Sequence, residues 1–186
     1  LMAEEAGLDE CLVKNVQDNL DVLPSDMNLA GAEIEFQEIE NKETLLKRYL
    51  DQVRDDYDFI LIDCPPSLNI LTINALTAAD TVLVPIQCEY YALEGLNQVL
   101  KTVELVRKKL NPQLELEGVV FTMYDARTNL SLQVVESVKS NLNQTIYKTI
   151  IPRNVRLAEA PSHGKSINLY DTRSTGAESY RMLAAE

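Results

Sequence analysis

The stretch that decides the fold is Asp58-Phe59-Ile60-Leu61-Ile62-Asp63, which is followed by Cys64-Pro65-Pro66. Four consecutive apolar residues between two acids are typical of a strand that is buried on both faces, as in the interior of a parallel sheet. We therefore expect residues 58–63 to form a buried strand with a carboxylate at its carboxyl end.

Further apolar runs alternate with helical patterns along the rest of the chain. Strands are predicted at residues 20–23, 81–86, 116–123 and 146–151. Helices are predicted within 28–57 (two helices), around 70–76, at 92–110 and at 132–142. Repeated units of buried strand, helix and buried strand require right-handed crossovers. The expected fold is therefore α/β, with an open, mostly parallel, doubly wound sheet.

The composition excludes several classes of protein. With 186 residues, of which 46% are hydrophobic and 25% charged, the chain is globular and long enough for a sizeable core. No apolar run approaches the length of about eighteen residues that a membrane helix needs. One histidine and three widely spaced cysteines argue against a zinc site and for reduced thiols in the cytosol. No linker divides the chain, so residues 1–186 are expected to be a single domain.

The charge is unevenly distributed. The net charge is −12, which by itself argues against nucleic acid because phosphate repels an acidic surface. Residues 119–175, however, carry seven basic and four acidic side chains, a net charge of +3. From the charge count alone, chance unevenness among solvated surfaces is the favoured explanation, and a local basic patch is the alternative. The charge count therefore leaves both interpretations open.

Ligands of an open α/β sheet bind beyond the carboxyl ends of its strands, so the residues that follow each strand are the first site candidates. They are Asp63, Gln87, Tyr124-Asp125 and Pro152-Arg153-Asn154. An acid after an apolar strand is the Walker B arrangement, in which the carboxylate holds Mg²⁺, usually through water, beside a phosphate. A carboxylate that caps the following turn produces the same pattern, so Asp63 alone does not decide the function.

Six segments in a fixed order are more specific than the single acid. They are L-A-G-A-E (29–33), D-C-P-P-S (63–67), I-N-A-L (73–76), Q-C-E-Y-Y-A-L-E-G-L (87–96), T-M-Y-D-A-R-T-N (122–129) and I-P-R-N-V-R-L-A-E-A-P-S-H-G (151–164). Together they resemble the ParA family of partition ATPases with a deviant Walker A motif, and in detail its chromosomal Soj branch. The resemblance covers nearly the whole chain.

One motif of that family does not occur in the sequence. Its members open with a strand and a K-G-G-x-G-K-T loop, whose N–H groups and lysine bind phosphate at a helix N-terminus. The nearest segment, Gly164-Lys165-Ser166, has Glu159 at the position of the required glycine, and no helix is expected at 167–170. We predict that it is a loop. The chain is therefore expected to be the C-terminal three-quarters of such an ATPase, without the N-terminal strand and P-loop, and to be inactive by itself.

The resemblance implies a P-loop NTPase fold and a homodimer that hydrolyses ATP with Mg²⁺, binds double-stranded DNA without sequence preference and responds to a ParB-type centromere-binding protein. Such a protein works on the bacterial nucleoid in the cytoplasm, without a membrane. By the same resemblance, Asp63 is the Mg²⁺-associated Walker B acid, and Pro152 and Asn154 contact adenine. Arg127 and Arg156 match positions that hold DNA phosphates, and residues 87–96 lie near the dimer interface.

Each of these residues also has a structural interpretation. Pro152 ends a strand, Asn154 is a good helix N-cap, and the two arginines are spaced to pair with Asp125 and Glu159. Two other functions are also open. One is a DNA-binding or interaction module that uses no nucleotide, and the other is a related ATPase that positions the septum or the flagella.

Overall fold

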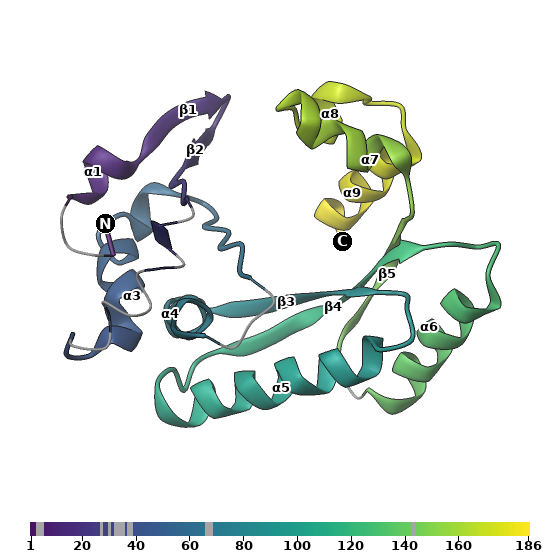
Figure 1. Ribbon diagram of the computed structural model, residues 1–186, viewed down its shortest axis with the longest axis horizontal. Helices are drawn as coiled ribbons and strands as arrows, with labels where there is room; N and C mark the ends of the chain where they lie inside the picture. The colour runs from purple at the N-terminus through teal and green to yellow at the C-terminus, as the bar shows by residue number, and fades with distance from the viewer. Residues whose placement is uncertain are drawn as a thin grey trace. The chain divides into compact units, whose positions relative to one another are not determined.

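The prediction of a parallel α/β sheet is confirmed in the computed structural model (Figure 1). The structure describes residues 1–2, 6–26, 28–29, 31, 36, 39–65, 69–142 and 144–186. The chain divides into two compact units. Unit 1 consists of Leu1–Asp80 and Leu105–Leu114, and unit 2 consists of Thr81–Glu104 and Glu115–Glu186. The expectation of a single domain across the chain stays a prediction.

Unit 2 is built on the three strands β3 (Thr81–Gln87), β4 (Glu115–Tyr124) and β5 (Ile146–Pro152), which are parallel and lie in the order β3-β4-β5. The helix α5 (Ala92–Lys109) connects the first two strands, and α6 (Asn129–Asn141) connects the last two. The three strands and both helices confirm the elements predicted from the apolar runs and the helical spacing.

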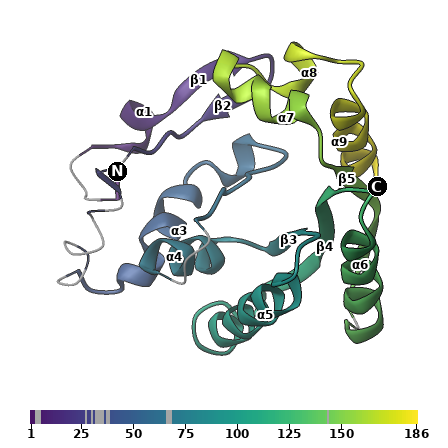
Figure 2. The same ribbon diagram turned by 45° about the vertical axis from the view of Figure 1, so that its right-hand side comes forward.

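The core of unit 2 lies between the sheet and these two helices. Figures 1 and 2 show α5 and α6 along one face of the sheet. Phe121 of β4 is fully buried there, together with Val138 of α6. The central strand β4 is buried on both faces over residues 118–121, as predicted, but the edge strand β3 alternates between buried and exposed side chains. The prediction of a doubly buried strand at 81–86 is therefore wrong, because only the face that carries Val82, Val84 and Ile86 packs against the core.

Short helices follow β5. They are α7 (Val155–Glu159), the 3₁₀ turn η4 (Ala160–His163), α8 (Ile167–Tyr170) and α9 (Thr175–Ala185). The segment Gly164-Lys165-Ser166 lies between η4 and α8, so its prediction as a loop is confirmed. The prediction of no helix at 167–170 is wrong, because the carbonyl oxygen of Ser166 accepts hydrogen bonds from the N–H groups of Leu169 and Tyr170 and closes one turn.

The outer edge of the sheet at β5 has a side-chain partner. The carboxylate of Glu186, just after α9, accepts hydrogen bonds from the backbone N–H groups of Lys148 (2.7 Å) and Thr149 (3.0 Å). These contacts hold the pKa of Glu186 below its usual value, since they stabilise the ionised carboxylate. The side chain thus satisfies N–H groups that a neighbouring strand would otherwise bind.

Most of the regular elements of unit 1 are short helices. Its elements are α1 (Leu8–Cys11), β1 (Val13–Gln17), β2 (Leu20–Val22), η2 (Lys42–Thr44), α3 (Leu45–Leu50), η3 (Arg54–Asp56) and α4 (Ile70–Ala78). The strand predicted at 20–23 is β2, which pairs with β1 in an antiparallel hairpin. Of the two helices predicted within 28–57, α3 is present, while residues 30, 32–35, 37 and 38 of that range lie outside the described residues.

A buried asparagine connects the helical part of unit 1. Phe36 and Leu45 are fully buried in one hydrophobic cluster of this unit. Asn74 of α4 is also fully buried. Its amide donates to the carbonyl oxygens of Lys42 (2.8 Å) and Ile70 (3.0 Å), and its oxygen accepts from the N–H of Leu46 (3.1 Å). Every polar atom of this side chain is therefore satisfied, as burial requires.

The strand predicted at 58–63 is not formed. Residues 58–65 belong to no helix, strand or sheet, and Phe59 and Leu61 are 86% and 93% exposed. A strand needs a neighbour that binds its backbone groups. Among the described residues of unit 1, the strands β1 and β2 pair with each other and with no further strand. The apolar run therefore has no ladder to join.

Candidate functional site

The carboxyl ends of the three strands meet at one edge of unit 2. In the sheet register Gln87 lies opposite Thr122, and Tyr124 lies opposite Pro152. Beyond the ladder, the N–H of Arg153 donates to the carbonyl oxygen of Tyr124 at 2.9 Å. Its guanidinium lies 3.2 Å from the carboxylate of Glu89, which follows β3. Arg153, which follows β5, thus contacts both the last residue of β4 and a residue that follows β3.

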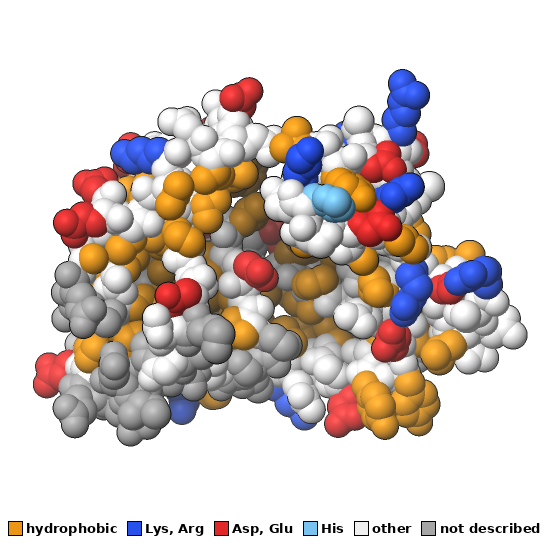
Figure 3. All heavy atoms as spheres, turned by 45° about the horizontal axis from the view of Figure 1, so that its top comes forward, with side chains coloured by type: hydrophobic (Ala, Val, Ile, Leu, Met, Phe, Trp, Pro, Cys, Tyr) orange, Lys and Arg blue, Asp and Glu red, His pale blue; other side chains and the backbone are white. Residues whose placement is uncertain are grey.

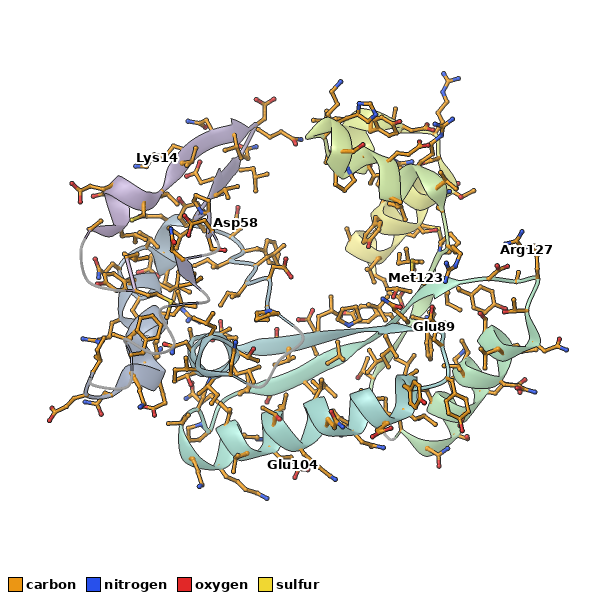
Figure 4. All side chains as sticks on the ribbon, viewed as in Figure 1. Lys14, Asp58, Glu89, Glu104, Met123 and Arg127 are labelled. Atoms are coloured by element: carbon orange, nitrogen blue, oxygen red, sulfur yellow. The ribbon has the colours of Figure 1, made fainter. Side chains whose placement is uncertain are left out.

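A strained residue precedes the loop after β4. Met123 has φ +53°, in the left-handed region that a bulky side chain rarely adopts. The register of β4 against β5 shifts between Phe121 and Tyr124, so this residue lies in an irregular stretch of the strand. Such irregularities redirect the chain at the end of a strand. In Figure 4, Met123 and Glu89 lie near the ends of their strands, and the loop with Arg127 projects beyond them.

Arg127 lies in that loop and pairs with Asp125. Its Nε and Nη2 atoms donate to the two carboxylate oxygens at 2.9 and 2.7 Å, and its backbone N–H donates to Oδ1 at 3.0 Å. These bonds from Arg127 hold the pKa of Asp125 well below its usual range. The arginine side chain is nevertheless 85% exposed, so its outer N–H groups face solvent.

Pro152 and Asn154 occupy the positions that their structural interpretations gave them. Pro152 is the last residue of β5. Asn154 is the N-cap of α7, because its Oδ1 accepts from the N–H of Arg156 at 2.9 Å. Its Nδ2 donates to the hydroxyl of Thr175 at 2.7 Å. One amide hydrogen and one lone pair of this side chain remain for another partner.

Arg156 lies in the first turn of α7 between two acids. Its Nη1 donates to Oε2 of Glu159 at 2.8 Å, and its Nε lies 3.5 Å from Oδ2 of Asp171. The hydroxyl of Tyr170 also donates to Oε2 of Glu159, at 3.1 Å. The pKa of Glu159 is lowered, first by Arg156 and then by Tyr170. Figure 3 shows acidic and basic side chains side by side over this part of the surface.

Asp63 lies in unit 1, within the irregular segment 58–65, and it is exposed. Because no strand precedes it, the Walker B arrangement predicted from the sequence is not formed by the described residues. Arg127, Pro152, Asn154 and Arg156 belong to unit 2, whereas Asp63 belongs to unit 1.

Sequence comparisons relate the chain to one family model and to proteins that match it over nearly its whole length. Residues 1–116 match the family described as an AAA domain. The chain is 57% identical over 186 residues to the sporulation initiation inhibitor protein Soj of Bacillus subtilis, covering all of this chain and 74% of that protein. It is 49% identical over 184 residues to the chromosome partitioning protein ParA of Caulobacter vibrioides, covering 98% of this chain and 69% of that protein. The chain belongs to the Soj/ParA family of chromosome-partitioning ATPases.

Solved structures agree with this assignment to the Soj/ParA family. Cobyrinic acid a,c-diamide synthase from Mycobacterium smegmatis, with a bound ATP analog and magnesium, has a TM-score of 0.83 and 35% identity, covering 99% of this chain and 68% of that one. A putative plasmid partition protein from Borrelia burgdorferi bound to AMPPNP has a TM-score of 0.80 and 25% identity, covering 99% of this chain and 70% of that one. The predicted P-loop NTPase type of fold is thereby confirmed.

The residues of this Soj/ParA chain fit a nucleotide and Mg²⁺ only in part. Within the described ranges, no group of three or more His, Cys, Asp and Glu side chains is arranged to hold a metal ion. Mg²⁺ beside a nucleotide often takes one or two carboxylates and receives its other ligands from phosphate and water. Asp63 can serve as such a carboxylate, whereas the sequence contains no K-G-G-x-G-K-T loop for the phosphates.

Three features of the site were not predicted from the sequence. Asp171, which follows α8, contacts Arg156 of α7, and Glu89, which follows β3, contacts Arg153 after β5, with the strand β4 lying between β3 and β5. No local spacing signals such contacts, because they depend on how the elements pack. The left-handed conformation of Met123 also has no signal in the residue type, which disfavours it.

Among the described helices, none is long and apolar enough to cross a bilayer.

Proposed function

We propose that this chain is part of an ATPase that segregates chromosomes or plasmids by binding double-stranded DNA without sequence preference. In this proposal the protein acts as an ATP-dependent homodimer in the bacterial cytoplasm, at the nucleoid, and a ParB-type centromere-binding protein stimulates its hydrolysis of ATP. Membership of the Soj/ParA family supports the general role. The DNA contact is assigned to Arg127 and Arg156.

The observation that carries the DNA contact is the position of these two arginines. Both are exposed, both follow strands of the same parallel sheet, and both lie within residues 119–175, where the net charge is +3 in a chain of −12. Guanidinium groups bind phosphate oxygens of any DNA sequence, because the backbone carries no base information. Two exposed arginines at one sheet edge therefore suit a protein that holds any part of a nucleoid.

The test replaces Arg127 or Arg156 by glutamate in the full-length protein with Mg-ATP and measures binding to two unrelated duplexes at several salt concentrations. We expect weaker binding to both duplexes alike. Each lost phosphate contact reduces the slope of log affinity against log salt by about 0.9. ATP turnover without DNA is expected to stay near the original value, because neither arginine is assigned to the nucleotide.

Lys101→Glu in α5 is the matched control, since it makes the same change of charge on an exposed residue outside the basic segment. Unchanged DNA binding by both arginine variants, or an equal loss in the control, would contradict the assignment of the DNA surface to this edge of unit 2.

The nucleotide part of the proposal assigns Asp63 to Mg²⁺ through water, and Pro152 and Asn154 to the adenine side. Bound Mg-ATP supplies the phosphoryl group that is hydrolysed, while these residues orient it. The 186-residue chain lacks the K-G-G-x-G-K-T loop, so we expect no measurable heat when Mg-ATP is titrated into it. A dissociation constant in the micromolar range would contradict this expectation.

The dimer in this proposal uses the segment after β3. Tyr90 and Tyr91 are exposed there and pack edge to face, with ring centroids 5.1 Å apart. Exposed aromatic side chains are enriched at protein interfaces. Tyr90→Ala in the full-length protein is expected to weaken ATP-dependent dimerisation in analytical ultracentrifugation without changing the melting temperature.

A further inference from the structure

Arg127 and Arg156 differ in how much of the guanidinium remains accessible. Arg127 binds one carboxylate through Nε and Nη2, so both hydrogens of its Nη1 point away from Asp125. Arg156 is contacted on two sides, by Glu159 at Nη1 and by Asp171 at Nε, and its side chain is 54% exposed against 85% for Arg127. Nη2 of Arg156 has neither contact, but a phosphate that binds two nitrogens of this guanidinium needs Nη1 or Nε as well, and an acid is already at each of these.

The main acid at Arg156 is itself held in place. Oε2 of Glu159 accepts from the hydroxyl of Tyr170 at 3.1 Å, and the ring of Tyr170 stacks on His163 with the centroids 4.9 Å apart. If Arg156 turns toward DNA, Glu159 is held back by Tyr170 and does not follow. A DNA phosphate and the two carboxylates compete for the same donors, because carboxylate and phosphate bind the guanidinium in the same way.

We propose that Glu159 and Asp171 are built-in competitors of DNA phosphate, which hold Arg156 in a paired state and lower the affinity of this surface for DNA. The proposal rests on the proposed DNA-binding function and adds two residues that determine its strength. Weak binding suits a protein that must release DNA, and the two acids lower the affinity for phosphate at Arg156.

The experiment measures the affinity of the full-length protein with Mg-ATP for a fluorescent duplex of arbitrary sequence. The variants are Glu159→Gln and Asp171→Asn, which remove the charge and keep the oxygen that accepts from Tyr170 or from the N–H of Arg173. We expect each variant to bind about two- to fivefold more tightly, as the loss of an exposed ion pair predicts. Glu136→Gln on α6 is the matched control, because this exposed acid lies in the same segment.

The same acid substitutions in an Arg156→Ala background separate competition from a general change of charge. If Glu159 and Asp171 act through Arg156, the gain disappears in that background. A gain that persists there, a gain no larger than that of Glu136→Gln, or no gain at all would overturn the proposal. Arg156→Ala alone tests the underlying function, since an unchanged affinity would remove this arginine from the DNA surface, whereas a loss without any gain from the acids would leave the DNA surface standing and overturn the competition.

Discussion

Two apolar stretches of similar composition have different fates in this protein. Residues 58–63 contain Phe59, Ile60, Leu61 and Ile62 in a row, and they form no strand. Residues 118–121 of β4 are equally apolar, and they are buried on both faces between β3 and β5. The amino-acid pattern is the same in kind. The difference is that β4 has a hydrogen-bonding neighbour on each side, whereas the described residues offer none to 58–63.

An apolar run therefore predicts that a segment can be buried, and its neighbours decide whether it is. Hydrophobic burial is non-directional, while a strand also needs at least one neighbouring strand that binds its backbone N–H and C=O groups. In β4 both requirements are met by elements close in sequence, because α5 and α6 return the chain to the sheet. Residues 58–63 have the apolar side chains that burial requires, but no described residue provides the neighbouring strand.

The largest expected effect comes from removing a phenylalanine in each stretch. Phe121→Ala in β4 removes a fully buried ring, and we expect it to lower the free energy of unfolding by about 3–5 kcal/mol. Phe59→Ala makes the same chemical change at a side chain that is 86% exposed, and surface substitutions of this kind usually stay within about 0.5 kcal/mol. Urea unfolding of both variants measures the difference, and equal losses would show that Phe59 is packed in solution.

The next prediction concerns self-association through the exposed stretch. An apolar segment with unpaired backbone groups tends to pair with another chain, and each large side chain exposed to water forgoes roughly 1.5–3 kcal/mol of burial. We therefore expect the 186-residue chain to associate in analytical ultracentrifugation and Leu61→Asp to shift it toward the monomer. Val155→Asp, at an exposed residue of unit 2, is the matched control. A monodisperse wild-type monomer that melts cooperatively above about 50 °C, within the usual mesophile range, would contradict this prediction.

Much of unit 2 could be predicted from the sequence because its signals are local. The strands β3, β4 and β5 and the helices α5 and α6 each carry their own apolar periodicity, and each is found close to its predicted bounds. The sequence also offered two ion pairs as structural interpretations, because their partners are only two or three residues apart. They are Arg127 with Asp125 and Arg156 with Glu159.

The unpredicted features depend on packing between distant residues. Asp171 and Glu89 meet their arginines only once α8 and β3 are in place. The hairpin partner of β2 and the missing strand at 58–63 are likewise decided by which strand lies beside which, and residue patterns within one segment do not contain that information. The roles of Asp63, Pro152, Asn154, Arg127 and Arg156 in binding stay predictions.

Two glycines sharpen the comparison between close-packed and open positions. A Cβ atom added to Gly118 in β4 would lie 2.7 Å from the ring of Tyr147 and 3.3 Å from the carbonyl oxygen of Thr145. Gly118→Ala is therefore expected to cost about 1–3 kcal/mol, as overpacking does. Gly95 in α5 has nothing within 4 Å of that position, so Gly95→Ala should stabilise by about 0.5–1 kcal/mol. Thermal melts that rank the two variants in the opposite order would contradict the packing of β4.

The smallest expected effect is at the outer edge of β5. There a side chain binds backbone N–H groups in place of a neighbouring strand, whereas residues 58–63 have no such partner among the described residues. The carboxylate of Glu186 accepts from the N–H groups of Lys148 and Thr149, and these bonds lower its pKa in the folded state. A carboxylate with a lowered folded pKa contributes stability above its unfolded pKa, and this contribution is lost as the pH falls through the folded value. We expect Glu186→Gln to be less stable than the original chain at pH 7 and to differ less from it near pH 3.

Hydrogen exchange provides the local readout. The amides of Lys148 and Thr149 should exchange faster in the variant, while those of Phe59 and Leu61 should exchange fast in both proteins, and equal rates at Lys148 in the two proteins would show that Glu186 does not close this edge.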